Sequence, residues 1–234
     1  MTMAALLVED LHVRYAHGQV LNGVNMYAMP GEIVAIIGKK GSGRSSALRA
    51  ISGQAKTMKG SVRVAGHKLN NGPNPDISHL GLDLTPIENS LSMHLTSEEN
   101  LLQPIHNSSS LGGALALGTI YDLCPSLSQV RNTVCSELSH IQHRLLAIAR
   151  LLRHGAQVIL LNNIATGLSD QCLTLLAQFI VNLKNQNYSI ILTEQGTRFS
   201  GLIADRFYLL EDGKISHTFT SAELQQHQGL LTNL

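Results

Sequence analysis

The sequence predicts an α/β fold in which helices cover both faces of a mostly parallel sheet. Short segments of continuous apolar residues are typical of strands buried on both sides, and here they are residues 32–37, 158–161 and 189–193. Segments with helical spacing of apolar residues alternate with them, at 45–51, 140–152 and 171–183. Chains that alternate strands and helices in this way form parallel sheets. The third observation is a glycine-rich loop, residues 38–43, between the first of these strands and its helix.

Shorter strands are expected before and after this alternating region. Two of them precede the first buried strand, and a third follows Gly60. Near the C-terminal end, a turn at Glu211, Asp212 and Gly213 separates the two arms of a hairpin. The expected strands are residues 6–11, 20–29, 61–64, 207–210 and 214–217.

The middle of the chain changes character and predicts short helices between loops. Thr96 followed by acidic residues is typical of a helix start, because a hydroxyl caps the helix and carboxylates favour its positive end. Residues 107–113 are rich in Ser and Gly and predict a loop. We therefore expect one domain over residues 1–234, with an α/β core formed by 1–86 and 146–234 and a helical subdomain at 87–145.

Composition limits the classes of function. Of the 234 residues, 14% are charged, against roughly 25% in an average domain, and this suggests that partners cover part of the surface. A net charge of +1, 4% aromatic residues and the absence of Trp argue against a nucleic-acid partner. The three cysteines lack zinc-site spacing and predict free thiols. Neither a signal peptide nor an apolar run of about 18 residues is visible, so we expect a cytoplasmic protein.

The loop at 38–43 has the context of a phosphate-binding loop, because it follows a buried strand and opens a helix. Glycines let backbone N–H groups turn inward as an anion nest, and the helix N-terminus adds positive charge. Such loops end in Lys followed by Ser or Thr, whereas here Arg44 stands in the lysine position. Arginine keeps the charge but is longer and planar, so we expect it to lie across the loop. The candidate phosphate-binding residues are Gly38, Gly41, Ser42, Gly43, Arg44, Ser45 and Ser46.

From Leu7 through Ile215 the sequence resembles an ABC-transporter ATPase, nearest to the subunits of branched-chain amino acid and urea importers. The matching segments are residues 8–15, 31–38, 50–53, 95–101, 147–150, 204–206 and 210–215. The resemblance implies a P-loop NTPase of the ABC type, with an antiparallel β subdomain and an inserted helical subdomain beside the parallel core. It implies ATP as the cofactor, and it places Tyr15 where an aromatic ring stacks on adenine.

The residues that carry the family's chemistry are largely replaced. The resemblance places Asn162 where an aspartate holds Mg²⁺ and Asn163 where a glutamate polarises the attacking water. An amide is a weak partner for a hard cation and cannot act as a general base. Ile87 stands in the position of a glutamine that contacts Mg²⁺, and Gln195 in the position of a switch residue that is often histidine. Ser45 keeps the hydroxyl that binds Mg²⁺ directly.

The family's signature motif, which reaches the γ-phosphate held by a second subunit, is also altered. Ser139 is retained and can cap the helix or bind an anion. His140 and Ile141 replace two glycines, and a branched side chain at Ile141 hinders close approach of the backbone to phosphate. Glu88 and Glu194 lie one residue away from emptied catalytic positions, and this shift is expected to turn their side chains away.

The resemblance and the replacements together predict a subunit that binds ATP with little or no hydrolysis and holds Mg²⁺ weakly or not at all. Its expected partners are a membrane permease subunit and a second ATP-binding subunit, in a homodimer or a heterodimer. This places the chain peripherally at the inner face of the cell membrane. Two alternatives remain: a regulatory or scaffold pseudo-ATPase that is no longer coupled to transport, and a slow but genuine transport ATPase.

Overall fold

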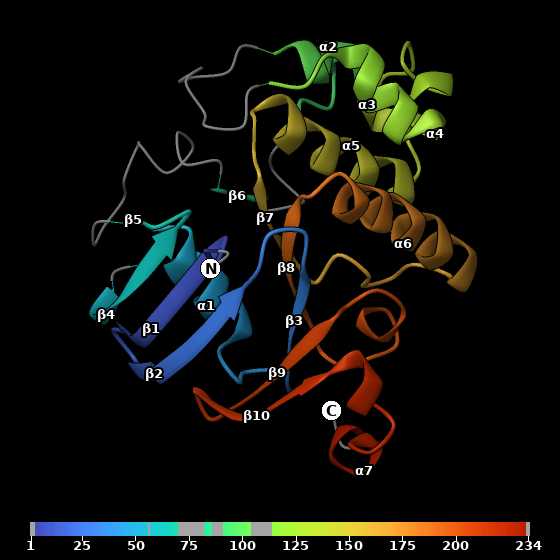
Figure 1. Ribbon diagram of the computed structural model, residues 1–234. Coiled ribbons are helices and arrows are strands. Elements are labelled where there is room, and N and C mark those ends of the chain that lie inside the picture. The colour runs from blue at the N-terminus through green and yellow to red at the C-terminus, as the bar shows by residue number, and fades with distance from the viewer. Residues whose placement is uncertain (1–2, 56, 70–81, 86–90, 104–113, 233–234) are drawn as a thin grey trace.

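The computed structural model describes residues 3–55, 57–69, 82–85, 91–103 and 114–232. Within these residues the strands form two sheets, which Figure 1 shows beside each other with helices around them. One sheet has six strands in the order β10-β9-β3-β8-β7-β6, and the other has four in the order β2-β1-β4-β5.

The six-stranded sheet is parallel except for one edge strand. β3 (Ile33–Ile37) pairs in parallel with β8 (Ser189–Glu194) and β9 (Arg206–Glu211). Beyond β8 lie β7 (Val158–Asn162) and β6 (Leu82–Thr85), also parallel. β10 (Lys214–Thr220) pairs with β9 in the antiparallel direction, as a hairpin requires. Continuous apolar segments form β3, β7 and β8 because both faces of these strands are covered.

Helices from different parts of the chain cover the two faces. Ile33, Ala35 and Ile37 of β3 share a core cluster with α5 (His140–Arg153) and α6 (Asp170–Asn185). The intervening Val34 and Ile36 belong to a second cluster, formed with α1 (Arg44–Ile51) and the four-stranded sheet. Figure 1 shows α5 and α6 on one side of β3 and α1 on the other. The predicted α/β class with both faces covered is confirmed.

The four-stranded sheet consists of β1 (Leu6–Tyr15), β2 (Gly18–Ala28), β4 (Thr57–Val64) and β5 (His67–Lys68). All its pairings are antiparallel, as expected. β1 is longer than the expected 6–11, because pairing resumes after a register shift near Asp10, whose φ is 47°. This irregularity interrupts the alternation of buried and exposed side chains.

The predicted helical region contains short helices within its described residues. They are α2 (Ser97–Leu102), α3 (Leu117–Leu123), α4 (Pro125–Gln129) and the 3₁₀ turn η2 (Cys135–Glu137). Thr96 caps α2 in a capping box with Glu99, as the sequence indicated. α5 runs without a break through residue 145, the expected boundary of the subdomain.

The C-terminal part adds η3 (Ser200–Leu202), η4 (Ser221–Glu223) and α7 (Gln228–Leu231). All three cysteines are free thiols, and Cys124 and Cys135 are buried. In the part of the chain that the structure describes, no helix combines the length and apolar character needed to cross a membrane.

Candidate functional site

The candidate site lies at the carboxyl edge of the parallel sheet. β3 ends at Ile37 and leads into the phosphate loop, while the neighbouring strands β8 and β7 end at Glu194 and Asn162. In open α/β sheets, ligands bind at this edge. The fold therefore brings together the residues that the sequence singled out in the loop and after the later strands.

The backbone of the phosphate loop has the conformation of an anion cradle. Gly41 and Gly43 have φ values of 90° and 106°, which L side chains rarely adopt. A Cβ atom on Gly38 would lie 2.3 Å from the carbonyl oxygen of Leu210, so only glycine fits there. The hydroxyl of Ser42 is buried and has no hydrogen-bond partner among the described residues. An unpaired buried donor beside a glycine loop fits a phosphate oxygen.

Replacing Gly38 by Ala is expected to destabilise the protein, because the added methyl group meets a backbone carbonyl that has no room to shift. The expected loss in the free energy of unfolding is about 3 kcal/mol, measured by urea titration. Gly196→Ala is the control, since no atom lies within 4 Å of its added Cβ and its φ is not positive. Equal unfolding midpoints for the two variants would contradict the close fit at Gly38.

The Arg44 side chain reaches from the start of α1 to the residue after β7. Arg44 is the first residue of α1 and only 8% exposed, and its Nη1 donates to Oδ1 of Asn163 at 3.3 Å. Burial lowers the pKa of the guanidinium, and the negative charge of Glu194 partly offsets this effect. The guanidinium therefore bridges the phosphate loop and the end of β7.

Asn162 stands at the position implied to hold Mg²⁺, but its amide oxygen is already occupied. Oδ1 accepts hydrogen bonds from the hydroxyls of Ser45 at 3.0 Å and Thr193 at 2.7 Å, and from Nδ2 of Asn163 at 3.3 Å. A carboxylate with these donors would still carry a full charge and further lone pairs, whereas a neutral amide has neither. Among the described residues, the site therefore offers a magnesium ion the hydroxyl of Ser45 and a neutral amide oxygen in place of a carboxylate.

Asn163 sits in a strained backbone position that suits its own side chain. Its φ is 50°, in the left-handed region where Asn is better tolerated than other non-glycine residues. Its N–H donates to the carbonyl oxygen of Thr193 at 2.9 Å, which ties the loop after β7 to β8. Its amide oxygen accepts a hydrogen bond from Arg44 and its amide nitrogen donates one to Asn162, but an amide does not act as a general base.

Thr193 faces Asn162, so Glu194, the next residue of β8, points to the opposite face of the strand and contacts the loop after β7, as its sequence position suggested. It is 7% exposed, and its Oε1 accepts from the backbone N of Ala165 at 3.0 Å. Burial raises its pKa to about 6, although this backbone bond and the charges of Arg44 and Arg144 act in the opposite direction. Glu194 is thus a buried carboxylate that ties the end of β8 to the loop after β7.

The remaining predicted residues occupy the margins of the site. Tyr15 ends β1 and is 36% exposed, so its ring is accessible to a base. Ser46 is half-buried in the first turn of α1, and Gln195 is exposed just after β8. Ile87 lies outside the described residues, as does Glu88.

The signature-like segment opens α5 as predicted. The Ser139 hydroxyl accepts from the backbone N of Gln142, and the Gln142 side chain accepts from the backbone N of Ser139. His140 is exposed, and Ile141 is half-buried and packs against the core. The side chain of Ile141 therefore packs against the core of its own chain.

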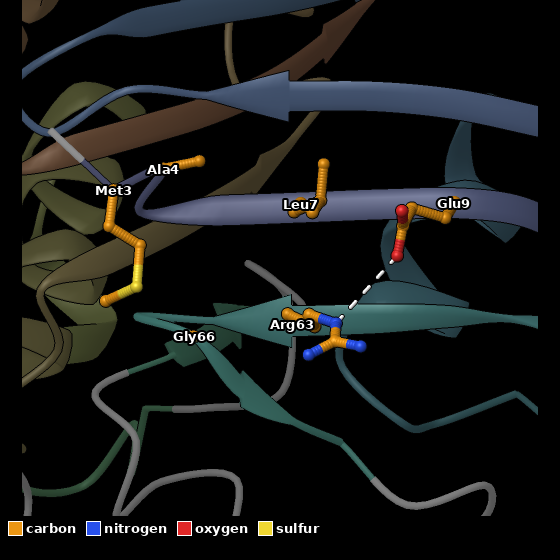
Figure 2. A pocket seen from close by; sticks show the side chains of 6 residues that line it. All are labelled: Met3, Ala4, Leu7, Glu9, Arg63 and Gly66. Carbon is orange, nitrogen blue, oxygen red and sulfur yellow. Dashed lines mark ion pairs between the residues drawn. The ribbon is translucent and has the colours of Figure 1, made fainter. Parts of the chain in front are cut away.

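A hollow elsewhere on the molecule includes none of the candidate residues. Figure 2 shows it on the face of β1 and β4 that turns away from the core. Its lining residues are Met3, Ala4, Leu7, Glu9, Arg63 and Gly66. The candidate site is therefore defined by the cradle and the sheet edge, and not by this hollow.

Comparisons with known proteins agree with this geometry. A family model described as "ABC transporter" matches residues 21–165. The chain is 28% identical to the high-affinity branched-chain amino acid transport ATP-binding protein BraG of Pseudomonas aeruginosa, over 94% of each sequence. It is also 28% identical to the ribose import ATP-binding protein RbsA of Bacillus subtilis, over 92% of this chain and 45% of that protein.

Solved structures show the same fold. An ATP-binding cassette of an ABC transporter in its ADP conformation matches with a TM-score of 0.85 and 20% identity, over 99% of this chain and 98% of that one. A nucleotide-free cassette matches with a TM-score of 0.83 and 21% identity, over 97% and 96%. The expected P-loop NTPase fold of the ABC type is confirmed.

Proposed function

Because the chain belongs to the ABC transporter family, we propose that it is the nucleotide-binding subunit of an importer, and that it binds ATP with little or no hydrolysis. The observation that carries the second part is the saturated amide oxygen of Asn162. The site retains a phosphate cradle and a cation in Arg44, but amides stand at the two positions where the chemistry requires acids.

ATP binding is supported by the cradle itself. The N–H groups of the loop from Gly38 to Gly43, the unpaired hydroxyl of Ser42 and the guanidinium of Arg44 would hold the phosphates. The exposed ring of Tyr15 would stack on the base. Ser139, from a second subunit, would offer its hydroxyl and N–H to the same phosphates.

Weak hydrolysis is expected because the amide of Asn163 cannot act as a general base for the attacking water. Phosphoryl transfer to water depends on charge neutralisation and on a group that orients the attacking water. Asn163 accepts no proton, and its side chain is engaged with Arg44 and Asn162. Loss of a general base alone typically costs about 10²–10⁴ in rate. The bound nucleotide therefore acts mainly as a clamp.

The same reasoning applies to the metal. The Asn162 amide oxygen already accepts from three donors, and in the part of the chain that the structure describes no carboxylate contacts Ser45, so Mg²⁺ would contribute little to binding. Arg44 would supply the positive charge near the phosphates. No step of the proposed activity passes through a metal ion.

The partners are proposed from the relatives. The name of BraG describes transport of branched-chain amino acids, and the name of RbsA describes import of ribose. By analogy, this chain would work at the inner face of the membrane with a permease and a second ATP-binding subunit. The α/β core would carry the nucleotide, and residues 87–145 would form the helical subdomain.

Calorimetric titration with ATP, in Mg²⁺ and in EDTA, tests this proposal. We expect binding in both, with dissociation constants that agree within about threefold, because the described residues that contact Ser45 offer Mg²⁺ no carboxylate. The control is Asn162→Asp, which restores one carboxylate and should make binding Mg²⁺-dependent. If the wild type needs Mg²⁺ to bind ATP, the proposal that Mg²⁺ contributes little to binding is wrong. If it binds ATP in neither condition, the chain is a scaffold that holds no nucleotide.

A further inference from the structure

Three hydrogen bonds join the start of α1 to the end of β7 through two neighbouring amides. Arg44 Nη1 donates to Oδ1 of Asn163 at 3.3 Å, and Nδ2 of Asn163 donates to Oδ1 of Asn162, also at 3.3 Å. The Ser45 hydroxyl donates to the same Asn162 oxygen at 3.0 Å. Because Arg44 and Ser45 are consecutive residues, these bonds close a ring of four side chains.

Asn163 is the member of this ring whose side chain both accepts and donates. A neutral amide carries an acceptor and two donors on one planar group, whereas a carboxylate has no proton to donate to Asn162. The backbone of Asn163 is fixed as well, since its φ is 50° and its N–H donates to the carbonyl oxygen of Thr193 at 2.9 Å. The amide oxygen is therefore held at a set place within hydrogen-bond distance of the guanidinium.

The contact with Asn163 leaves the other donors of the Arg44 guanidinium for a ligand. Arg44 is 8% exposed, and its Nε and Nη2 make no hydrogen bond within the described residues. Neither atom is fully buried, so both retain contact with solvent. The guanidinium presents its N–H groups in a planar fork, so a bond that fixes one end also fixes the direction of the others. The side chain is thus oriented before a ligand arrives.

We propose that Asn163 is a positioning residue that holds the Arg44 guanidinium ready for the nucleotide phosphates. The inference rests on the proposed function, since it names the group that prepares the positive charge of the ATP site. A long side chain that becomes fixed only on binding loses rotamer freedom at that moment, and this loss weakens binding. The Asn163 amide fixes Arg44 beforehand and, being neutral, leaves its charge to the phosphates. The amide at position 163 therefore contributes to ATP binding.

Asn163→Gly tests this role, because glycine removes the amide and adopts a φ of 50° without strain. In calorimetric titrations with ATP in EDTA, this variant should bind about fivefold to tenfold more weakly than the wild type. In an Arg44→Ala background, the same change should alter the affinity by less than about twofold, since no guanidinium is left to position. A residue that only supported the fold of its loop would weaken binding equally in both backgrounds.

Asn187→Gly is the matched control. Asn187 also has a positive φ, 67°, and its side chain is exposed. It lies in the turn before β8, at the opposite edge of the sheet from the site. The same replacement there should leave the affinity for ATP unchanged.

The orientation of Arg44 can also be observed in the wild type, which decides the question if Asn163→Gly proves unstable in thermal unfolding. A hydrogen-bonded guanidinium rotates slowly about its Cζ–N bonds. NMR spectra of the nucleotide-free protein should therefore show separate Nη signals for Arg44, identified by their absence from Arg44→Lys. A single averaged signal would show that Arg44 is not held before ATP binds, and would overturn the inference.

The outcomes of the titrations separate this inference from the proposed function. Equal affinities for the wild type and Asn163→Gly, or equal losses in the two backgrounds, overturn the role of Asn163 while ATP binding stands. Tighter binding by Asn163→Gly also overturns it, since the amide would then hold Arg44 away from the phosphates. Absence of ATP binding by the wild type overturns both the inference and the proposed function.

Discussion

Arg44→Ala is expected to lower the affinity for ATP by at least about 100-fold. Arg44 is the first residue of the helix that follows the cradle, and in the proposed complex its guanidinium would supply the positive charge beside the phosphates. Losing two charge-assisted hydrogen bonds of about 1.5 kcal/mol each accounts for this factor. Calorimetric titration with ATP in EDTA measures it.

Arg44→Lys is the matched control, since it keeps the charge but loses the planar fork. We expect its affinity to stay within about tenfold of the wild type. Thermal unfolding of both variants shows whether the fold survives the loss of the contact with Asn163. If the alanine variant binds ATP as tightly as the wild type, the phosphates are not held by Arg44, and the clamp proposed here is wrong.

Restoring the lost groups should restore hydrolysis. In a background that carries H140G and I141G, the further pair N162D and N163E is expected to raise steady-state phosphate release by at least about 100-fold over the wild type. The reason is that a carboxylate can hold Mg²⁺ and another can polarise water, which two amides cannot. The glycines give a second subunit's nucleotide close access to the backbone at the start of α5.

The control for this experiment replaces Asn163 by Gln in place of Glu, with the other three changes kept. Glutamine has the size of glutamate and suffers the same strain at a φ of 50°, so only the charge differs. Its phosphate release should stay near that of the wild type. Equal rates of phosphate release for the two variants would show that a carboxylate at position 163 does not restore hydrolysis.

Much of the fold is predictable because local patterns and tertiary burial agree. The apolar runs that become β3, β7 and β8 have both faces covered, and the helices between them end within two residues of their expected limits. Three outer strands are exceptions. β4 begins four residues before its expected start, and β10 ends three residues after its expected end. β1 ends four residues after its expected end. Its second half contains His12, Arg14 and Tyr15 and follows the irregularity at Asp10, so its pattern is less apolar than that of a buried strand.

The members of the site are predictable for a topological reason, but their interactions are not. The carboxyl ends of parallel strands lie at one edge of the sheet, and only β8 separates β3 from β7, so the phosphate loop lies close to Asn162 and Asn163. One of the hydrogen bonds to the Asn162 amide oxygen comes from the Thr193 hydroxyl, and the sequence identifies Thr193 only as part of a strand. The contact that holds Glu194 comes from the N–H of Ala165, in the loop after β7, and nothing in the sequence pairs these two residues.

The central claim is that the site holds ATP without converting it, and the fate of bound nucleotide tests this most directly. The purified chain is incubated for hours with ATP and Mg²⁺, separated from free nucleotide and denatured, and the released nucleotide is identified by chromatography. We predict that ATP is recovered. Recovery of ADP in amounts that grow with time would contradict the account.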